Sequence, residues 1–100
     1  MRRGTTPTHT FEIPFDTSNI KTAMVIYAQE DAEVFRKETG ECNFDGNKIS
    51  VKLTQEETLK LKCAQTVQIQ LRILTNDGEA MATDVRDVSV GKCLNSEVLK

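Results

Sequence analysis

The sequence holds few side chains of the types that carry out catalysis or bind metals. His9 is the single histidine, and the three cysteines, Cys42, Cys63 and Cys93, fall in different segments. They lack the Cys-x-x-Cys spacing of zinc sites and redox motifs. Sequence spacing leaves open a cysteine–histidine nucleophile pair, because such a pair is assembled by the fold. The odd number and wide separation of the cysteines predict free, mostly buried thiols, with neither a disulfide framework nor a metal site.

Acidic residues occur in two adjacent pairs, Glu30-Asp31 and Glu56-Glu57. A glycosidase needs two carboxyl groups that face each other across a cleft, whereas neighbouring acids in turns are exposed to water. The five glycines are isolated, so no phosphate-binding loop is present. A calcium site would have to use loop oxygens without EF-hand spacing: Asp45, Asn47 and Asp77. We therefore predict that the protein is not an enzyme and uses no cofactor or metal.

The elements that would position any site are β-strands. In residues 48–53 and 67–73, apolar and polar residues alternate with a period of two. This alternation is typical of a strand with one buried face. Asn76-Asp77-Gly78 then predicts a hairpin turn that leads into a closing strand over 79–90. The apolar parity changes within that closing strand, so we expect one extra residue, a β-bulge, near Arg86-Asp87.

The remaining segments complete a small all-β domain. The pattern predicts further strands over 9–15, 20–29 and 33–38, a polar loop over 39–47, and a helical turn whose capping box joins Thr54 to Glu57. Pro14 cannot donate a backbone hydrogen bond, so the first strand is expected to be an edge strand or to end there. Strand 20–29 is apolar on both sides, which is typical of a central strand covered on each face. About seven strands with one helical turn predict an immunoglobulin-like antiparallel β-sandwich, and a small closed barrel is the alternative.

The chain of 100 residues is long enough for one domain. We expect a flexible N-terminal arm over 1–8, the sandwich over 9–94 and a C-terminal tail over 95–100. The net charge of −2 and the scattered basic residues argue against a nucleic-acid partner. No apolar stretch approaches the roughly 20 residues of a membrane helix, and the first residues lack the apolar core of a signal peptide. We therefore expect synthesis in a cytoplasm and no membrane partner.

Two sets of residues are candidates for an interaction surface. Val25 and Tyr27 belong to the strand that is apolar on both sides, so they lie either in the core or under a partner chain. Gln68, Gln70 and Arg72 form a polar ridge along the next alternating strand. A single-stranded nucleic-acid platform would instead require exposed aromatic residues among basic ones, which the sequence does not show.

Several strings carry information beyond their periodicity: 53–59 (LTQEETL), 67–73 (VQIQLRI) with a turn that ends at Gly78, 3–11 (RGTTPTHTF) and 27–29 (YAQ). They resemble small proteins from the tail or structural modules of phages and prophages of Gram-positive bacteria. More distantly, the layout is similar to the N-terminal β-sandwich of siphophage baseplate upper proteins, which attaches receptor-binding parts to the tail. The chain lacks the long C-terminal extension of those proteins, which favours an adaptor or decoration subunit over an adhesin.

The resemblance implies a non-enzymatic virion structural or assembly component that contacts other virion subunits, with a homo-oligomer as a further option. It would be made in the host bacterial cytoplasm and then enter the virion. One alternative is a carbohydrate- or cell-surface-binding module, which needs exposed aromatic residues near a loop; the candidates for this role are Tyr27 and Phe44. Another alternative is a cytoplasmic regulatory protein that binds a host factor.

Overall fold

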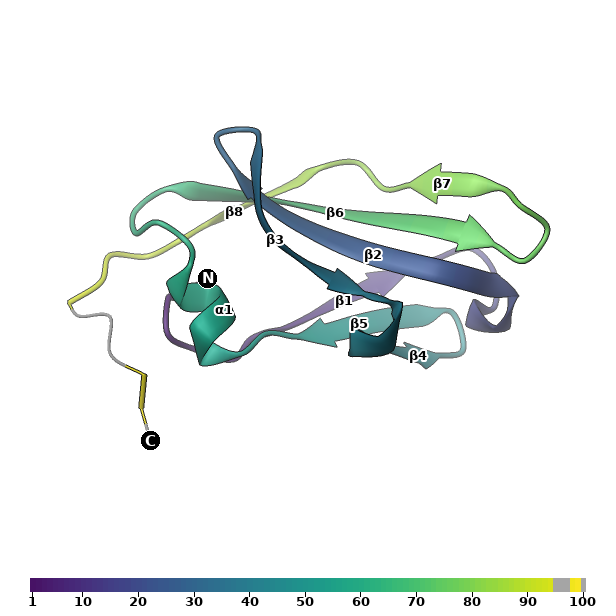
Figure 1. Cartoon of the computed structure of the whole chain (residues 1–100), viewed down its shortest axis with the longest axis horizontal. Coiled ribbons are helices and arrows are strands. Elements are labelled where there is room, and N and C mark those ends of the chain that lie inside the picture. Colours follow the sequence, from purple (N-terminus) through teal and green to yellow (C-terminus); the bar gives the residue numbers. More distant parts are fainter. Residues whose placement is uncertain (95–97, 100) are drawn as a thin grey trace.

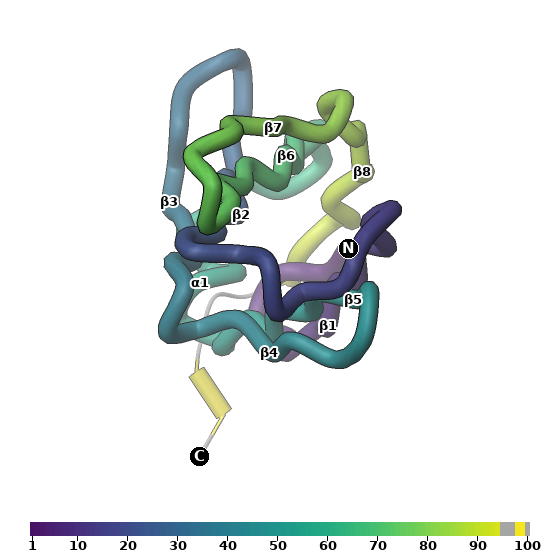
Figure 2. Tube along the Cα trace, turned by 90° about the vertical axis from the view of Figure 1, so that its right-hand side faces the viewer, coloured from purple at the N-terminus to yellow at the C-terminus, as the bar shows by residue number. Residues whose placement is uncertain are grey.

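The protein is a sandwich of two antiparallel sheets (Figures 1 and 2). The computed structural model describes residues 1–94 and 98–99. One sheet has the strand order β1-β5-β4, and the other has the order β3-β2-β6-β7 with β8 also paired to β6. The strands are β1 (Thr8–Glu12), β2 (Ile20–Gln29), β3 (Ala32–Glu38), β4 (Cys42–Asp45), β5 (Lys48–Lys52), β6 (Thr66–Thr75), β7 (Ala80–Ala82) and β8 (Arg86–Ser89). The predicted all-β sandwich is confirmed.

The connections give this sandwich an immunoglobulin-like topology. Three hairpins join β2 to β3, β4 to β5 and β6 to β7 within their sheets, while the chain crosses between sheets after β1, β3 and β5. The crossings include two short 3-10 helices, η1 (Thr17–Asn19) and η2 (Thr39–Glu41), and the helix α1 (Gln55–Leu59). In this arrangement the pairs β1–β5 and β2–β6 correspond to the B–E and C–F pairs of an immunoglobulin domain.

Apolar side chains from both sheets fill the space between the layers. The strands alternate with the predicted period, so odd-numbered positions of β2, β5 and β6 point inward and even-numbered positions point outward. The core consists of Phe11, Ile13, Val25, Tyr27, Phe35, Ile49, Val51, Leu53, Leu61, Val67, Ile69, Leu71, Ile73 and Val90. Because each sheet contributes one apolar face, the other face of each sheet is left on the outside of the molecule.

The structure corrects the prediction for 39–47, which is not a loop throughout. Residues 42–45 form β4, which pairs with β5 through a two-residue connection, Gly46-Asn47. Gly46 has a φ of +58°, as the first central position of a type II′ turn requires. Phe44 remains 39% exposed at this sheet edge. The run CNFD contains one large apolar residue, which is too few to reveal a strand by alternation.

The last hairpin contains the predicted extra residue, at a different place. Ile69 pairs with Arg86 and Arg72 pairs with Ala82, so three steps along β6 face four steps along the returning chain. The extra residue lies in the segment 83–85. There the Thr83 amide donates to the Leu71 carbonyl, and the Thr83 hydroxyl accepts a hydrogen bond from the Leu71 amide. The surplus position therefore separates β7 from β8 instead of bulging near residues 86–87.

The predicted helical turn is confirmed. The Thr54 hydroxyl accepts a hydrogen bond from the Glu57 amide at 3.1 Å, and the Glu57 carboxylate accepts one from the Thr54 amide at 2.9 Å. These two bonds satisfy donors that a helix start leaves free. The cap therefore sets where α1 begins, at the point where the chain crosses from β5 to β6.

The prediction of three free thiols is wrong for two of them. Cys63 and Cys93, 30 residues apart, form a disulfide, while Cys42 is a free, half-buried thiol. Spacing could not reveal the pair because the two residues meet only at the end of the β6–β8 ladder. There the Val90 amide donates to the Gln65 carbonyl and the Ala64 amide donates to the Gly91 carbonyl. The disulfide closes this ladder just beyond its last hydrogen bonds.

The expected N-terminal arm lies against the sandwich. The Met1 amine donates to the Ser89 carbonyl at 2.6 Å, and the Gly91 amide donates to the Met1 carbonyl at 2.8 Å. The Arg3 guanidinium reaches the Leu59 carbonyl at 2.7 Å. These contacts join the arm to α1 and to the end of β8. Of the expected tail over 95–100, residues 95–97 and 100 lie outside the described residues.

Candidate interaction surface

The structure separates the two sets of candidate surface residues. Val25 and Tyr27 are 0% exposed and point into the core, so the prediction that they form an interaction surface is wrong. Gln68 and Gln70 are half-buried and Arg72 is exposed, all on the outward side of β6. Neighbouring residues of β2 and β6 face the same way in a sheet, so the outward side of β2 beside this ridge carries its even-numbered positions.

Tyr27 and His9 form a hydrogen bond between the two sheets. The Tyr27 hydroxyl lies 2.7 Å from His9 Nδ1, and the Tyr27 ring stacks on Phe35 with centroids 4.6 Å apart. Burial, followed by the nearby Glu57 carboxylate, raises the pKa of Tyr27, while burial and the charge of Arg86 lower the pKa of His9. Both groups are therefore neutral at pH 7. A neutral imidazole with its proton on Nε2 can accept a hydrogen bond from the Tyr27 hydroxyl at Nδ1, and this bond ties β1 to β2.

A buried ion pair fixes α1 against the larger sheet. Lys37 is 5% exposed, and its Nζ lies 2.8 Å from Glu57 Oε1 and 3.4 Å from Glu41 Oε2. Burial disfavours the charged lysine, but the hydrogen bonds and charges of Glu57 and Glu41 together outweigh burial and raise the pKa of Lys37. Burial likewise opposes the Glu57 charge, but Lys37 and the hydrogen bonds from Thr54 together lower the pKa of Glu57. These two charges satisfy each other, which is a structural arrangement.

The free thiol of Cys42 lies close to this ion pair. Burial, followed by the Glu41 charge, raises the pKa of Cys42, so the thiol stays protonated at neutral pH and is a weak nucleophile. In the sheet, Cys42 and His9 are both register partners of Val51, from opposite sides, so a whole strand separates the thiol from the imidazole. Among residues 1–94 and 98–99, no three His, Cys, Asp or Glu side chains are grouped so that they could hold a metal ion.

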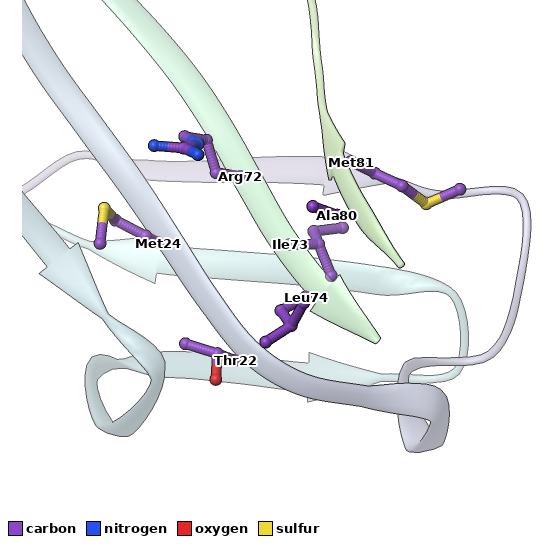
Figure 3. Close-up of a pocket in the computed structure, with 7 residues that line it drawn as sticks. All are labelled: Thr22, Met24, Arg72, Ile73, Leu74, Ala80 and Met81. Carbon is purple, nitrogen blue, oxygen red and sulfur yellow. The ribbon is translucent and has the colours of Figure 1, made fainter. Parts of the chain in front are cut away.

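The outward side of the five-stranded sheet has a different character. We call it the broad face, and its central members are Thr22, Met24, Ile26, Ala28, Gln68, Gln70, Arg72, Leu74, Ala80 and Ala82. Figure 3 shows one end of it, where side chains from β2, β6 and β7 line a hollow of about 290 Å³. A second hollow of about 170 Å³, lined in part by Ile26, Ala28 and Gln70, lies further along the same face. An apolar stripe therefore runs beside the polar ridge.

The outward side of the three-stranded sheet provides an internal comparison. This narrow face consists of Thr8, Thr10, Glu12, Asn43, Asp45, Lys48, Ser50 and Lys52. Each of these residues is polar, and acidic and basic residues oppose each other across the strands, as in the row of Glu12, Lys48 and Asp45. The narrow face is suited to water. The broad face, with Met24, Ile26 and Leu74 half-buried in its centre, is suited to contact with another surface.

The sequence held a signal for the correct face of β2. Both sides of residues 20–29 are apolar, so periodicity within the strand does not say which side is outward. The neighbouring strand β6 is apolar at odd positions and polar at three of its four central even positions, which identifies its outward side. Antiparallel pairing of Ile26 with Gln70 would then have placed Ile26 outward and Tyr27 inward.

No helix in the described part of the chain is long and apolar enough to cross a membrane. Searches against protein-family models, curated proteins and solved structures gave no match.

Proposed function

We propose that this protein is a non-enzymatic structural or assembly component that acts through contacts with other protein subunits. The observation that carries the proposal is the difference between the two outer faces of one sandwich. The narrow face is polar at every outward position, while the broad face exposes an apolar stripe centred on Met24, Ile26 and Leu74. An apolar stripe rimmed by polar residues is a common feature of protein interaction sites.

We propose a phage or prophage virion as the setting of these contacts, in a tail, baseplate or decoration layer. The support for this setting is the sequence resemblance of residues 3–11, 53–59 and 67–73 to tail-module proteins. In this setting the chain is made in the host bacterial cytoplasm and is then incorporated into the particle. The partners are other virion subunits, and nucleic acid and membrane take no part.

Three interactions within the sandwich hold it in one conformation, which suits a subunit that binds others through a rigid surface. The Lys37–Glu57 pair fixes α1 to the larger sheet, the Tyr27–His9 bond joins the two sheets, and the disulfide holds the end of β8. A surface held in one conformation before binding loses less conformational entropy when it binds. These ties therefore favour association through a preformed face.

The carbohydrate- or cell-surface-binding alternative loses one of its two candidate aromatic residues. Tyr27 is fully buried, which leaves Phe44, 39% exposed at the β4 edge. Phe44 is the one exposed aromatic ring among the described residues, and a single ring does not provide the stacking platform that such a module needs.

The test is a comparison of two substitutions in the bacterium that carries the gene. Ile26→Asp places a charge on the broad face, and Ser50→Asp places the same charge on the narrow face; both positions are half-buried and central in their sheets. Induced particles are purified and the chain is quantified in them by mass spectrometry. The proposal expects the chain in wild-type and Ser50→Asp particles and its loss from Ile26→Asp particles. A chain absent from wild-type particles would refute the virion setting.

A further inference from the structure

We propose that the broad face binds a second copy of this chain, about a two-fold axis parallel to β2. This inference rests on the proposed function, because it takes the broad face to be an association surface, and it names the partner and the geometry. The arguments are the charges on either side of β2, the register of the strands and the area of the face.

One row across the sheet places opposite charges on the two sides of an apolar residue. Met24 is the register partner of Glu38 on β3 and of Arg72 on β6. Glu38 and Arg72 are both exposed on the outward side of their strands. The row therefore reads acid, apolar, base, with Met24 in the middle.

A two-fold axis along β2 makes this row complementary to itself. The rotation places β2 over β2 of the second copy and exchanges the two neighbouring strands, so β3 of each copy lies over β6 of the other. Met24 then faces Met24 of the second copy. Glu38 faces Arg72 of the second copy, and the symmetry creates the same pair again on the other side of the axis. An isologous contact of this kind is closed and stops at a dimer.

Among the described residues, the charges of Glu38 and Arg72 are not neutralised by an opposite charge, although the Glu38 side chain also takes part in the capping box of η2 and the Arg36 guanidinium lies 3.7 Å from Met24 Sδ. Within the described part of the chain, Arg36 is paired with Glu33 at 2.9 Å, whereas neither Glu38 nor Arg72 takes part in an ion pair. In the next row Ile26 lies between Arg36 and Gln70. The same axis places the neutral Gln70 amide of the second copy over Arg36, whose charge is already paired with Glu33. The row of Met24 is therefore the one that selects the axis.

The area of the face predicts a weak dimer. β2 and β6 have ten residues each, β3 has seven and β7 has three. At about 3.3 Å along the strand and about 4.8 Å between strands each residue covers about 16 Å², so the footprint is about 480 Å² per copy. This area is below the roughly 800 Å² of a standard stable interface. We therefore expect a dimer that dissociates on dilution in free solution and is held together where many copies are concentrated.

Charge exchange at Glu38 and Arg72 tests the geometry with the purified full chain. Glu38→Arg gives a copy with two arginines in the row, and Arg72→Glu gives a copy with two glutamates. Each variant alone should stay monomeric in sedimentation velocity at concentrations where the wild type dimerises. An equimolar mixture of the two should dimerise again, because both symmetry-related pairs become complementary.

The matched controls carry the same charge changes on the narrow face. Glu12→Arg and Lys52→Glu lie at exposed outward positions of β1 and β5, and they should dimerise like the wild type, alone or mixed. Circular dichroism checks that each variant is folded. A second measurement avoids charge altogether. In a Cys42→Ser background, mild oxidation should cross-link Met24→Cys into a dimer and leave Ser50→Cys monomeric.

Three results would overturn the inference. One is a wild type that is monomeric up to millimolar concentration. Another is a dimer that survives both single substitutions, which would exclude the predicted pairs between Glu38 and Arg72. The third is a mixture of the two variants that fails to dimerise, which would exclude this axis. None of these results touches the proposed function, which fails separately if the chain is absent from purified particles.

Discussion

Loss of the Cys63–Cys93 disulfide should destabilise the protein strongly. The bond closes a loop of 30 residues, which includes all of β6, β7 and β8. Chain-entropy arithmetic for 30 residues gives a loss of about 3.6 kcal/mol in the free energy of unfolding at 25 °C, because the reduced unfolded chain gains that much freedom. For a domain of this size the unfolding midpoint should fall by about 15–20 °C.

The assay is urea unfolding of the oxidised wild type, the reduced wild type and the Cys63→Ser/Cys93→Ser variant, followed by circular dichroism. The reduced wild type and the double variant should unfold at the same lower urea concentration, and reductant should not lower the stability of the double variant further. Cys42→Ser is the matched control, since it removes a thiol without opening the loop. A loss below about 1 kcal/mol would refute the reasoning, because typical native disulfides contribute roughly 2–4 kcal/mol.

Three further predictions concern local features. Thr54→Ala should lower the free energy of unfolding by roughly 0.5–2 kcal/mol in a denaturant titration, with Thr54→Ser close to the wild type, since a serine hydroxyl can still accept the Glu57 amide. The depressed pKa of His9 means that the folded protein favours the neutral imidazole. The neutral His9 should therefore contribute fully to the free energy of unfolding above pH 6.5, and this contribution should be lost as the pH falls from 6.5 through the pKa of His9 in the folded protein. Thermal unfolding of the wild type should show this decrease in stability with falling pH, and His9→Gln should remove it. Glu30 has a φ of +54° in the β2–β3 turn, so Glu30→Asn should raise the stability by up to about 1 kcal/mol, and a loss of stability would contradict the strain argument.

The regular strands were predictable because their side chains report burial directly. In the centre of β6 the inward positions are apolar and the outward positions are mostly polar. The sequence of this segment alone therefore predicts that it is a strand and which of its sides faces the core. The helix cap was predictable for a similar reason, since the hydroxyl and the carboxylate that form it are three residues apart in sequence. In such cases the physical cause of the structure is local.

The features that sequence reasoning missed depend on contacts between distant segments. Lys37 occupies an inward position of β3, where its charge hides the alternation, and its burial depends on Glu57 from another element. The disulfide depends on the meeting of residues 63 and 93. The side of β2 on which Tyr27 lies depends on register with β6. Each of these needed the pairing of strands to be known first.

The position of the disulfide also determines how the protein bears mechanical load. Tension that enters at Cys93 passes through the covalent bond to Cys63 and reaches the chain just before β6. The four-residue strand β8, which would otherwise unzip from β6 one hydrogen bond at a time, lies outside that load path. In an oxidised molecule pulled from this end, the force is delivered to the junction between α1 and the central strand of the larger sheet. Optical-tweezers pulling with and without reductant should therefore show an early, low-force extension from β8 in the reduced molecule alone.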